Sequence, residues 1–233
     1  MEKLPILLLP GLVCDQALWE HQSRHLSEVA RPLIADLTTA DAIGALARSV
    51  LATAPQRFAL AGLSMGGYVA FEILRLAPER VARLALLDTN AHADTPEATQ
   101  RRQDAMRLAG EGRLADIMAT MLAMLVHPER ARDPAIAGTV RAMAERVGAD
   151  AFVRQQTAII NRVDSRPDLP DIACPTLVLC GRQDALCTVE THAAMAAAIP
   201  GARLAVIEEC GHLSPIEHPQ AVTALLRDWL IYG

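Results

Sequence analysis

The sequence predicts an α/β fold in which helices cover both faces of a doubly wound, mostly parallel sheet of about six strands. Two observations lead to this prediction. Short, continuous apolar runs alternate along the chain with longer helical patterns, and such runs are typical of parallel strands buried on both faces. The alternation stops between about residues 91 and 165, where helical patterns follow one another. We therefore expect a small helical insertion within the chain that forms the sheet.

The predicted strands are the apolar runs at residues 5–9, 32–35, 58–61, 84–87, 176–180 and 204–207. The expected helices lie between them, at residues 16–28, 41–53, 65–77, 189–198 and 218–231. Right-handed crossovers bring the carboxyl ends of parallel strands to one edge of the sheet, where ligands bind in such folds. The predicted domains are a core of residues 1–90 and 166–233 and a helical cap of residues 91–165, which we expect to cover that edge.

The composition argues against several kinds of partner. The net charge is −5 and aromatic residues make up 3% of the chain, which disfavours nucleic acid and other polyanions. The apolar run at residues 4–13 contains two prolines and is much shorter than the ~20 residues that span a bilayer, so we expect no membrane partner. Five cysteines are an odd number that suits a reducing compartment. We expect a cytoplasmic protein, and the sequence does not indicate its oligomeric state.

One segment between a predicted strand and a predicted helix has the pattern Gly-x-Ser-x-Gly, in which Gly62 and Gly66 flank Ser64. In the turn that this pattern predicts, side chains at both glycines would collide with neighbouring backbone, and the serine takes a strained conformation. The hydroxyl then projects at the sheet edge above a helix N-terminus, which favours negative charge. The pattern predicts a nucleophilic Ser64; the alternative is an incidental serine in a glycine-rich turn.

A serine hydroxyl needs a base to become an effective nucleophile. Among the seven histidines, His212 follows the last predicted strand directly and can therefore reach the same edge as Ser64. His218 begins the last predicted helix, and His192 lies in an alanine-rich helix where it is either solvated or buried. We therefore predict His212 as the base.

The base needs a carboxylate that holds its tautomer and stabilises the imidazolium. Asp184 follows the predicted strand at residues 176–180, and Asp88 follows the strand at residues 84–87. Both reach the expected edge. We favour Asp184 and keep Asp88 as the rival acid; the alternative role for Asp88 is to cap a helix or to order the loop before Thr89 and Asn90.

The chain order serine, aspartate, histidine resembles the α/β-hydrolase fold family, in particular its small serine esterases. The motifs that carry the resemblance are Leu9-Pro10-Gly11-Leu12, Trp19, the segment from Gly62 to Gly67, the segment from Gly181 to Asp184, and Gly211-His212. The resemblance implies that Ser64 is the nucleophile, His212 the base and Asp184 the acid. It also implies an oxyanion hole formed by the backbone N–H groups of Leu12 and Met65.

These residues predict a serine hydrolase that cleaves an ester or a related acyl bond of a small molecule, such as a carboxylester, thioester or lactone, through an acyl-enzyme. The mechanism requires neither a metal nor an organic cofactor. Members of this fold also act on C–C bonds, act as perhydrolases, or serve as small-molecule receptors without turnover, and the fold does not choose among these.

The sequence leaves open the roles of two groups of sulfur-containing side chains. Five methionines of the predicted insertion either line an adaptable acyl pocket or pack in a core; they are Met106, Met118, Met121, Met124 and Met143. Cys14, Cys187 and Cys210 each follow a predicted strand. With His212 they form a zinc or redox site, or they are small buried side chains. No Cys-x-x-Cys spacing supports a metal, so we predict no metal site.

Overall fold

The computed structural model describes residues 3–233, and its centre is a sheet of six strands in the order β2-β1-β3-β4-β5-β6. Each neighbouring pair is parallel. The strands are β1 (Pro5–Leu9), β2 (Arg31–Ile34), β3 (Phe58–Leu63), β4 (Val81–Leu87), β5 (Thr176–Gly181) and β6 (Arg203–Ile207). The predicted fold class is confirmed.

The central strands are buried from end to end, which explains why their sequences are continuously apolar. All six residues of β3 and of β5 are buried. β4 begins at Val81, three residues before the predicted apolar run, because Val81 pairs with Phe58 of β3 across a register shift. Backbone pairing extends this strand through Arg83. This charged residue interrupts the apolar pattern, so the pattern predicted too late a start for the strand.

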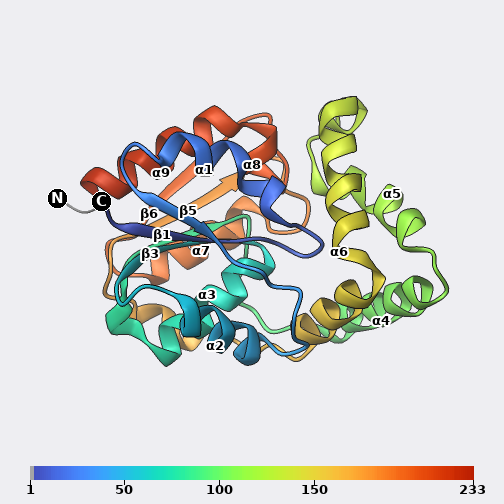
Figure 1. Ribbon diagram of the computed structural model, residues 1–233, viewed down its shortest axis with the longest axis horizontal. Coiled ribbons are helices and arrows are strands. Elements are labelled where there is room, and N and C mark those ends of the chain that lie inside the picture. Colours follow the sequence, from blue (N-terminus) through green and yellow to red (C-terminus); the bar gives the residue numbers. More distant parts are fainter. Residues whose placement is uncertain (1–2) are drawn as a thin grey trace.

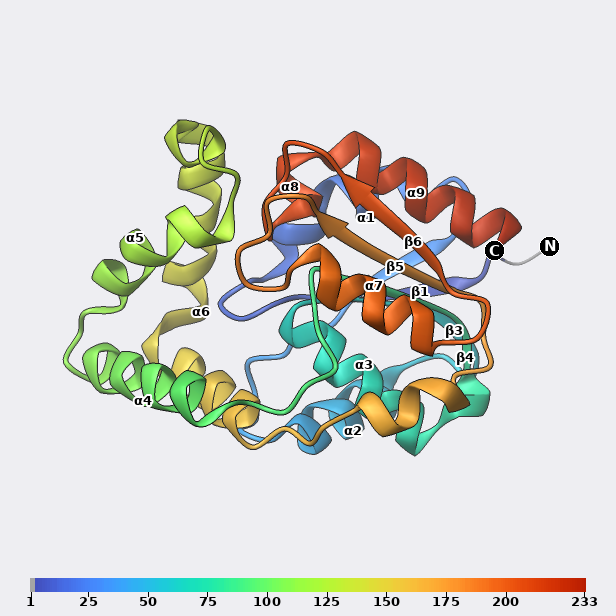
Figure 2. The same ribbon diagram turned by 180° about the vertical axis from the view of Figure 1, so that it is seen from behind.

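Helices cover the two faces of the sheet, as Figures 1 and 2 show. Buried apolar side chains form one core on each face. One face carries α1 (Glu20–Leu26), α8 (Ser214–Glu217) and α9 (Pro219–Tyr232), and the other carries α2 (Ile43–Thr53), α3 (Met65–Leu76) and α7 (Val189–Ala198). Successive side chains of a strand point to opposite faces. Leu8 therefore belongs to the core under α1 and α9, whereas Leu7 and Leu9 belong to the core under α2 and α3.

The predicted helix at residues 16–28 is divided in the structure. A 3-10 helix, η1 (Gln16–Trp19), comes first and α1 follows directly. The Asp15 side chain accepts a hydrogen bond from Ala17 N and starts the first of these turns. Trp19, at the junction, is fully buried. A second short 3-10 helix, η2 (Pro78–Arg80), leads into β4.

Helices without strands fill the chain between β4 and β5. They are α4 (Pro96–Gly110), α5 (Leu114–Leu125), η3 (Arg130–Arg132), α6 (Pro134–Ile160) and η4 (Arg166–Asp171). Thr95 caps α4 and Asp133 caps α6, each followed by a proline at the first helical position, where proline costs no hydrogen bond. Gly148, with φ 78°, breaks α6 into two parts. In Figure 1, α4, α5 and α6 stand beyond the carboxyl ends of the strands.

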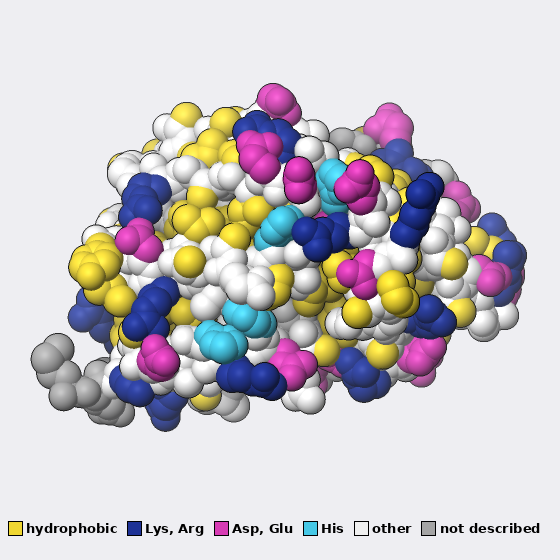
Figure 3. All heavy atoms as spheres, turned by 90° about the horizontal axis from the view of Figure 1, so that it is seen from above, with side chains coloured by type: hydrophobic (Ala, Val, Ile, Leu, Met, Phe, Trp, Pro, Cys, Tyr) yellow, Lys and Arg dark blue, Asp and Glu magenta, His cyan; other side chains and the backbone are white. Residues whose placement is uncertain are grey.

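The surface shows no single-sign charged face on the side formed by α1 and α9. Figure 3 shows acidic and basic side chains interspersed there. Among residues 3–233, no helix has both the length and the apolar character needed to cross a membrane.

The contact between α3 and β1 generates the first prediction. A Cβ added at Gly66 would lie 2.2 Å from the carbonyl oxygen of Leu9, whereas one added at Gly138 of α6 would meet nothing within 4 Å. We expect Gly66→Ala to lower the free energy of unfolding by about 2 kcal/mol or more, because backbone must move to relieve the overlap. We expect Gly138→Ala to be neutral or to stabilise by up to about 1 kcal/mol. Urea denaturation of both variants checks this; a Gly66→Ala protein as stable as the wild type would contradict the packing described.

Candidate active site

Ser64 stands at the turn between β3 and α3 in a conformation that few residues adopt. Its φ is 53° and its ψ is −114°, a combination outside the regions that side chains normally allow. Its N–H donates to the carbonyl of Leu87 at 3.0 Å. A Cβ at Gly62 would lie 2.4 Å from the carbonyl oxygen of Gly66. The turn therefore requires glycine at 62 and holds Ser64 in a strained backbone, as is common at functional sites.

Thr89, which follows β4, holds the carbonyl side of this turn. Its hydroxyl donates to Ser64 O at 2.8 Å, and its backbone N–H donates to His192 Nε2 at 2.9 Å. His192 Nδ1 lies 2.9 Å from the carbonyl of Thr188, so Nδ1 carries the proton and donates. Burial lowers the pKa of His192. This histidine is therefore a neutral, buried side chain that supports the turn.

His212 and Asp184 form a buried pair at the ends of β6 and β5. His212 Nδ1 lies 2.8 Å from Asp184 Oδ2, and both side chains are almost fully inaccessible. The other oxygen of Asp184 accepts hydrogen bonds from the backbone N–H groups of Leu186 at 2.8 Å and Cys187 at 2.9 Å. Nε2 is thus the imidazole nitrogen left for a reaction partner.

Mutual interaction shifts the pKa values of the pair in opposite directions. Burial by itself would lower the pKa of His212, but the charge of Asp184 and the hydrogen bond to it outweigh burial and raise that pKa above 6.5. Burial by itself would raise the pKa of Asp184, but His212 and the two backbone N–H groups lower it below 3.8. Asp184 therefore stays charged while His212 titrates.

Asp88 reaches the same edge but does not bond the histidine. Its carboxylate accepts hydrogen bonds from Gly181 N at 3.0 Å and from the hydroxyl of Ser214. Complete burial, and then the nearby charge of Asp184, raise the pKa of Asp88 well above its usual value. Asp88 therefore joins the ends of β4 and β5 to the start of α8.

Glu217, which the sequence did not single out, holds the loop that carries His212. Its carboxylate accepts hydrogen bonds from the N–H groups of Gly211 at 3.1 Å, Leu213 at 3.2 Å and His127 at 2.7 Å. The carbonyl of Leu125, at the end of α5, accepts from the N–H of His212 at 3.0 Å. The sequence gives only a weak indication of this role. An acid in the first turn of a helix, as Glu217 is in α8, is also common in helices at the protein surface.

The loop after β1 is held by a side chain from α6. Val13 has a φ of 49°, and its N–H donates to Gln155 Oε1 at 2.9 Å. Gln155 Nε2 donates to the carbonyl of Leu37 at 3.0 Å. Within residues 3–233 the N–H of Leu12 makes no hydrogen bond. Met65 is the first residue of α3, and the first N–H groups of a helix have no intrahelical acceptor.

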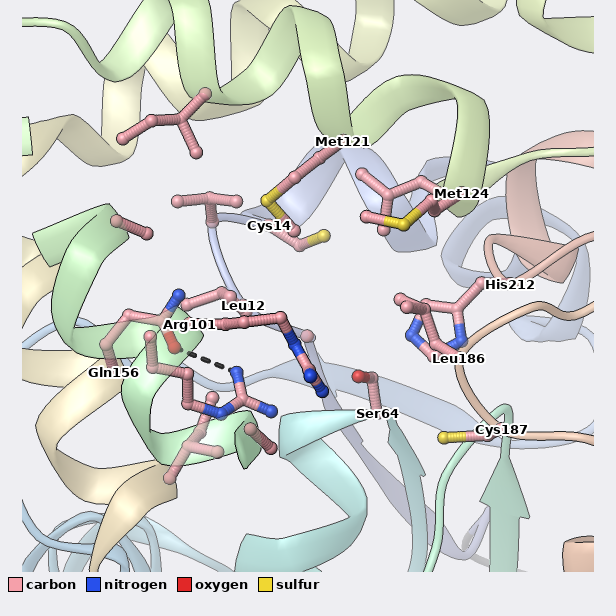
Figure 4. Close-up of a pocket in the computed structure, with 18 of the residues that line it drawn as sticks. Leu12, Cys14, Ser64, Arg101, Met121, Met124, Gln156, Leu186, Cys187 and His212 are labelled. Atoms are coloured by element: carbon pink, nitrogen blue, oxygen red, sulfur yellow. Dashed lines mark hydrogen bonds between the residues drawn. The ribbon is translucent and has the colours of Figure 1, made fainter. Parts of the chain in front are cut away.

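A cavity of about 740 Å³ opens above Ser64 and His212. Figure 4 shows both side chains projecting into it, with Leu12 nearby; among residues 3–233 no hydrogen bond joins the hydroxyl of Ser64 to the imidazole. Four of the five methionines singled out in the sequence line its wall, namely Met118, Met121, Met124 and Met143. Met106 is not part of the wall. The volume lies within the range of ordinary small-molecule sites.

The three cysteines divide between the cavity and the core. Cys14 and Cys187 line the cavity, and Cys210 is fully buried. Burial raises the pKa of each thiol, that of Cys14 to about 12. Ligand atoms of Asp184, Cys187 and His212 lie within 4.8 Å of one another. A metal there would need the thiolate, which the shifted pKa of Cys187 opposes, and would displace the bond between Asp184 and His212.

Known proteins resemble the chain in sequence and in structure. A family model described as the alpha/beta hydrolase fold matches residues 21–219. A solved thermophilic esterase from Thermogutta terrifontis is 32% identical, with a TM-score of 0.88 over 98% of this chain and 90% of that chain. The solved enol-lactonase from Burkholderia xenovorans LB400 is 26% identical, with a TM-score of 0.89 over 99% and 92%. The pimeloyl-[acyl-carrier protein] methyl ester esterase of Aromatoleum aromaticum is 26% identical over 208 residues, which are 77% of this chain and 76% of that protein.

The buried pair generates a prediction about titration. We expect the pKa of His212, measured by NMR of the ring nitrogens, to lie above 6.5 in the wild type. It should fall in Asp184→Asn, because burial then acts against the imidazolium with less opposing charge. Asp228→Asn, which removes an exposed partner of Arg203, is the control and should leave the titration unchanged. An equal His212 pKa in the wild type and Asp184→Asn would show that the pair does not set it.

Proposed function

Because the chain belongs to the α/β-hydrolase fold family, we propose that it is a serine hydrolase that cleaves an ester or related acyl bond of a small molecule. The observation that carries the proposal is the buried bond between His212 and Asp184 beside a strained Ser64, at the floor of one cavity. The similar proteins named as esterases and an enol-lactonase act on ester or lactone bonds, which supports an acyl substrate.

In the proposed mechanism, Ser64 is the nucleophile and His212 the base. Nε2 of His212 takes the hydroxyl proton while Oγ of Ser64 attacks the substrate carbonyl carbon. Asp184 keeps the Nδ1–H tautomer and stabilises the imidazolium. The proton then passes from Nε2 to the leaving alcohol, and an acyl-enzyme remains. His212 next deprotonates a water molecule, whose attack releases the acid and restores Ser64.

Two backbone N–H groups are proposed to hold the oxyanion of the tetrahedral intermediate. The N–H of Leu12 makes no hydrogen bond within residues 3–233, and Met65 begins α3 directly after Ser64. Each such donor contributes about 3 kcal/mol to transition-state stabilisation in comparable enzymes. The bond from Val13 N to Gln155 fixes the loop that carries Leu12.

The cavity wall favours a small, partly apolar substrate. Methionine side chains adapt to different ligand shapes, and four of them face the cavity. The second candidate function is a receptor that binds the same small molecules without turnover. The strained turn at Ser64 argues against it, because binding alone does not need such a conformation.

Activity of the serine variant tests this proposal directly. We expect Ser64→Ala to lower kcat/KM for 4-nitrophenyl acetate, butyrate and octanoate by about 10³-fold or more, because the nucleophile is lost. A fluorophosphonate probe should label the wild type and not this variant. Ser27→Ala, which removes an exposed hydroxyl at the C-terminal end of α1 that does not line the cavity, should match the wild type. Full turnover by a folded Ser64→Ala protein would refute the nucleophile, and a wild type that neither labels nor turns over would favour the receptor.

The pH profile gives an independent check. The base works only when neutral, and the pKa of His212 is raised above 6.5. The imidazolium of His212 loses its proton as the pH rises through this pKa. We therefore expect kcat/KM to rise with pH through an apparent pKa higher than 6.5 and then to level off. Steady-state rates on 4-nitrophenyl butyrate between pH 5 and 9 measure it. An acid limb centred below the ordinary histidine value would be inconsistent with His212 as the base.

A further inference from the structure

The cavity wall contains one arginine without a partner. Four arginines line the cavity: Arg101, Arg102, Arg113 and Arg162. Arg102 and Arg162 share the carboxylate of Asp94, at 3.2 Å and 2.8 Å. Arg113 pairs with Asp116 at 2.9 Å. Within residues 3–233, Arg101 makes no ion pair and no side-chain hydrogen bond.

The charges around Arg101 leave this wall positive. Asp94 is one carboxylate between two guanidinium groups, so that cluster carries a surplus positive charge. Asp104 also lines the cavity, but the guanidinium within ion-pair distance of it is that of Arg107, at 3.9 Å. Glu97, four residues before Arg101 on α4, is close enough to interact with its charge but forms no ion pair with it and does not line the cavity. Arg101 therefore adds a second positive charge that no acid of the cavity lining pairs with.

Gln156 supplies an unused donor on the same wall. The residue is 3% exposed, and its Oε1 accepts a hydrogen bond from Arg102 Nη1 at 2.9 Å. Its Nε2 donates no hydrogen bond within residues 3–233. Three side-chain atoms in that part are sealed from solvent without a partner: Trp19 Nε1, Gln22 Oε1 and Arg80 Nε. Gln156 Nε2 is not one of them, so it is open to the cavity.

Figure 4 shows how these groups lie relative to the proposed nucleophile. The side chain of Arg101 reaches from α4 across the cavity toward Ser64, and Gln156 lies to the left of it, farther from Ser64. Met121 and Met124 stand on the opposite, upper wall. The cavity thus has an apolar side and a side that offers N–H donors and positive charge.

We propose that Arg101 and Gln156 bind a carboxylate on the substrate, so that this enzyme selects small esters or lactones that carry a free acid group. The inference rests on the proposed hydrolase function and names its substrate class. A guanidinium presents paired N–H donors that match the two oxygens of a carboxylate, and the amide of Gln156 adds a third. Arg101 is exposed to solvent. An anion bound there neutralises the wall and gains charge-assisted hydrogen bonds, which a purely apolar substrate does not gain.

Paired substrates with and without the acid group test the proposal. Monoethyl adipate and ethyl hexanoate place the difference on the acyl side, and 4-acetoxybenzoate and its methyl ester place it on the leaving group. We expect the wild type to favour the anionic member of at least one pair by about tenfold or more in kcat/KM. The pair that responds identifies the side on which the carboxylate sits.

Variants assign the preference to the two residues. Arg101→Met should bring the ratio of anionic to neutral kcat/KM close to one, mainly through a higher KM for the anionic ester. Gln156→Glu, which keeps an acceptor for Arg102 but adds a negative charge, should also reduce the ratio. Arg227→Met, which removes an arginine of α9 that pairs with Glu28 and does not line the cavity, is the control and should keep the wild-type ratio.

Inhibition provides a readout that does not depend on turnover of an acidic ester. Adipate should compete with ethyl hexanoate in the wild type, and about tenfold more weakly in Arg101→Met. An equal loss on neutral and anionic esters in Arg101→Met would overturn the proposal and assign Arg101 to the transition state of every ester. The absence of any anionic preference in the wild type would overturn it too. Neither result bears on the hydrolase proposal, which fails if Ser64→Ala retains the turnover of ethyl hexanoate or if the wild type neither turns over any ester nor reacts with the fluorophosphonate probe.

Discussion

Two ionisable side chains buried against one another at the end of a sheet lose their hydration, and they are stable there only if neighbouring groups supply hydrogen bonds in its place. In this protein one segment bonds the pair itself, and three others hold the backbone and strand ends around it. The loop after β5 gives two N–H groups to Asp184, while Glu217 and the end of α5 hold the backbone beside His212. Asp88 joins the neighbouring strand ends. The remaining geometry of the cavity floor depends on this buried pair and its supports.

The sequence was most informative where backbone and burial alone decide the structure. Continuous apolar runs predicted the six parallel strands, because a strand buried on both faces has apolar side chains at successive positions rather than at alternate ones. Glycine spacing predicted the tight turn around Ser64, since a Cβ at Gly62 or Gly66 would overlap backbone. The edge shared by Ser64, Asp184 and His212 follows from parallel topology.

Spacing along the chain could not choose between carboxylates that end neighbouring strands. Asp88 and Asp184 both reach the edge, and only the loop after β5 turns its carboxylate onto His212. The hydrogen bonds by which distant segments hold the loops of the site could not be predicted from the sequence either. Gln155 and Glu217 lie on helices that begin and end like surface helices, and their burial depends on how the segments before β5 and after β6 fold back. The unpaired state of Arg101 depends in the same way on which acids the tertiary structure gives to its neighbours.

The bonds between the end of α5 and the loop of His212 constrain how this chain can diverge. Leu125 O and His127 N are bonded to residues around His212, and a Cβ at Gly211 would lie 2.5 Å from the carbonyl carbon of Val126. The three residues from Leu125 to His127 and the loop that carries His212 therefore constrain one another in position. The helix α4 and the first turns of α5 make none of these bonds, so their length and sequence can change, and with them the substrate preference, on an unchanged sheet.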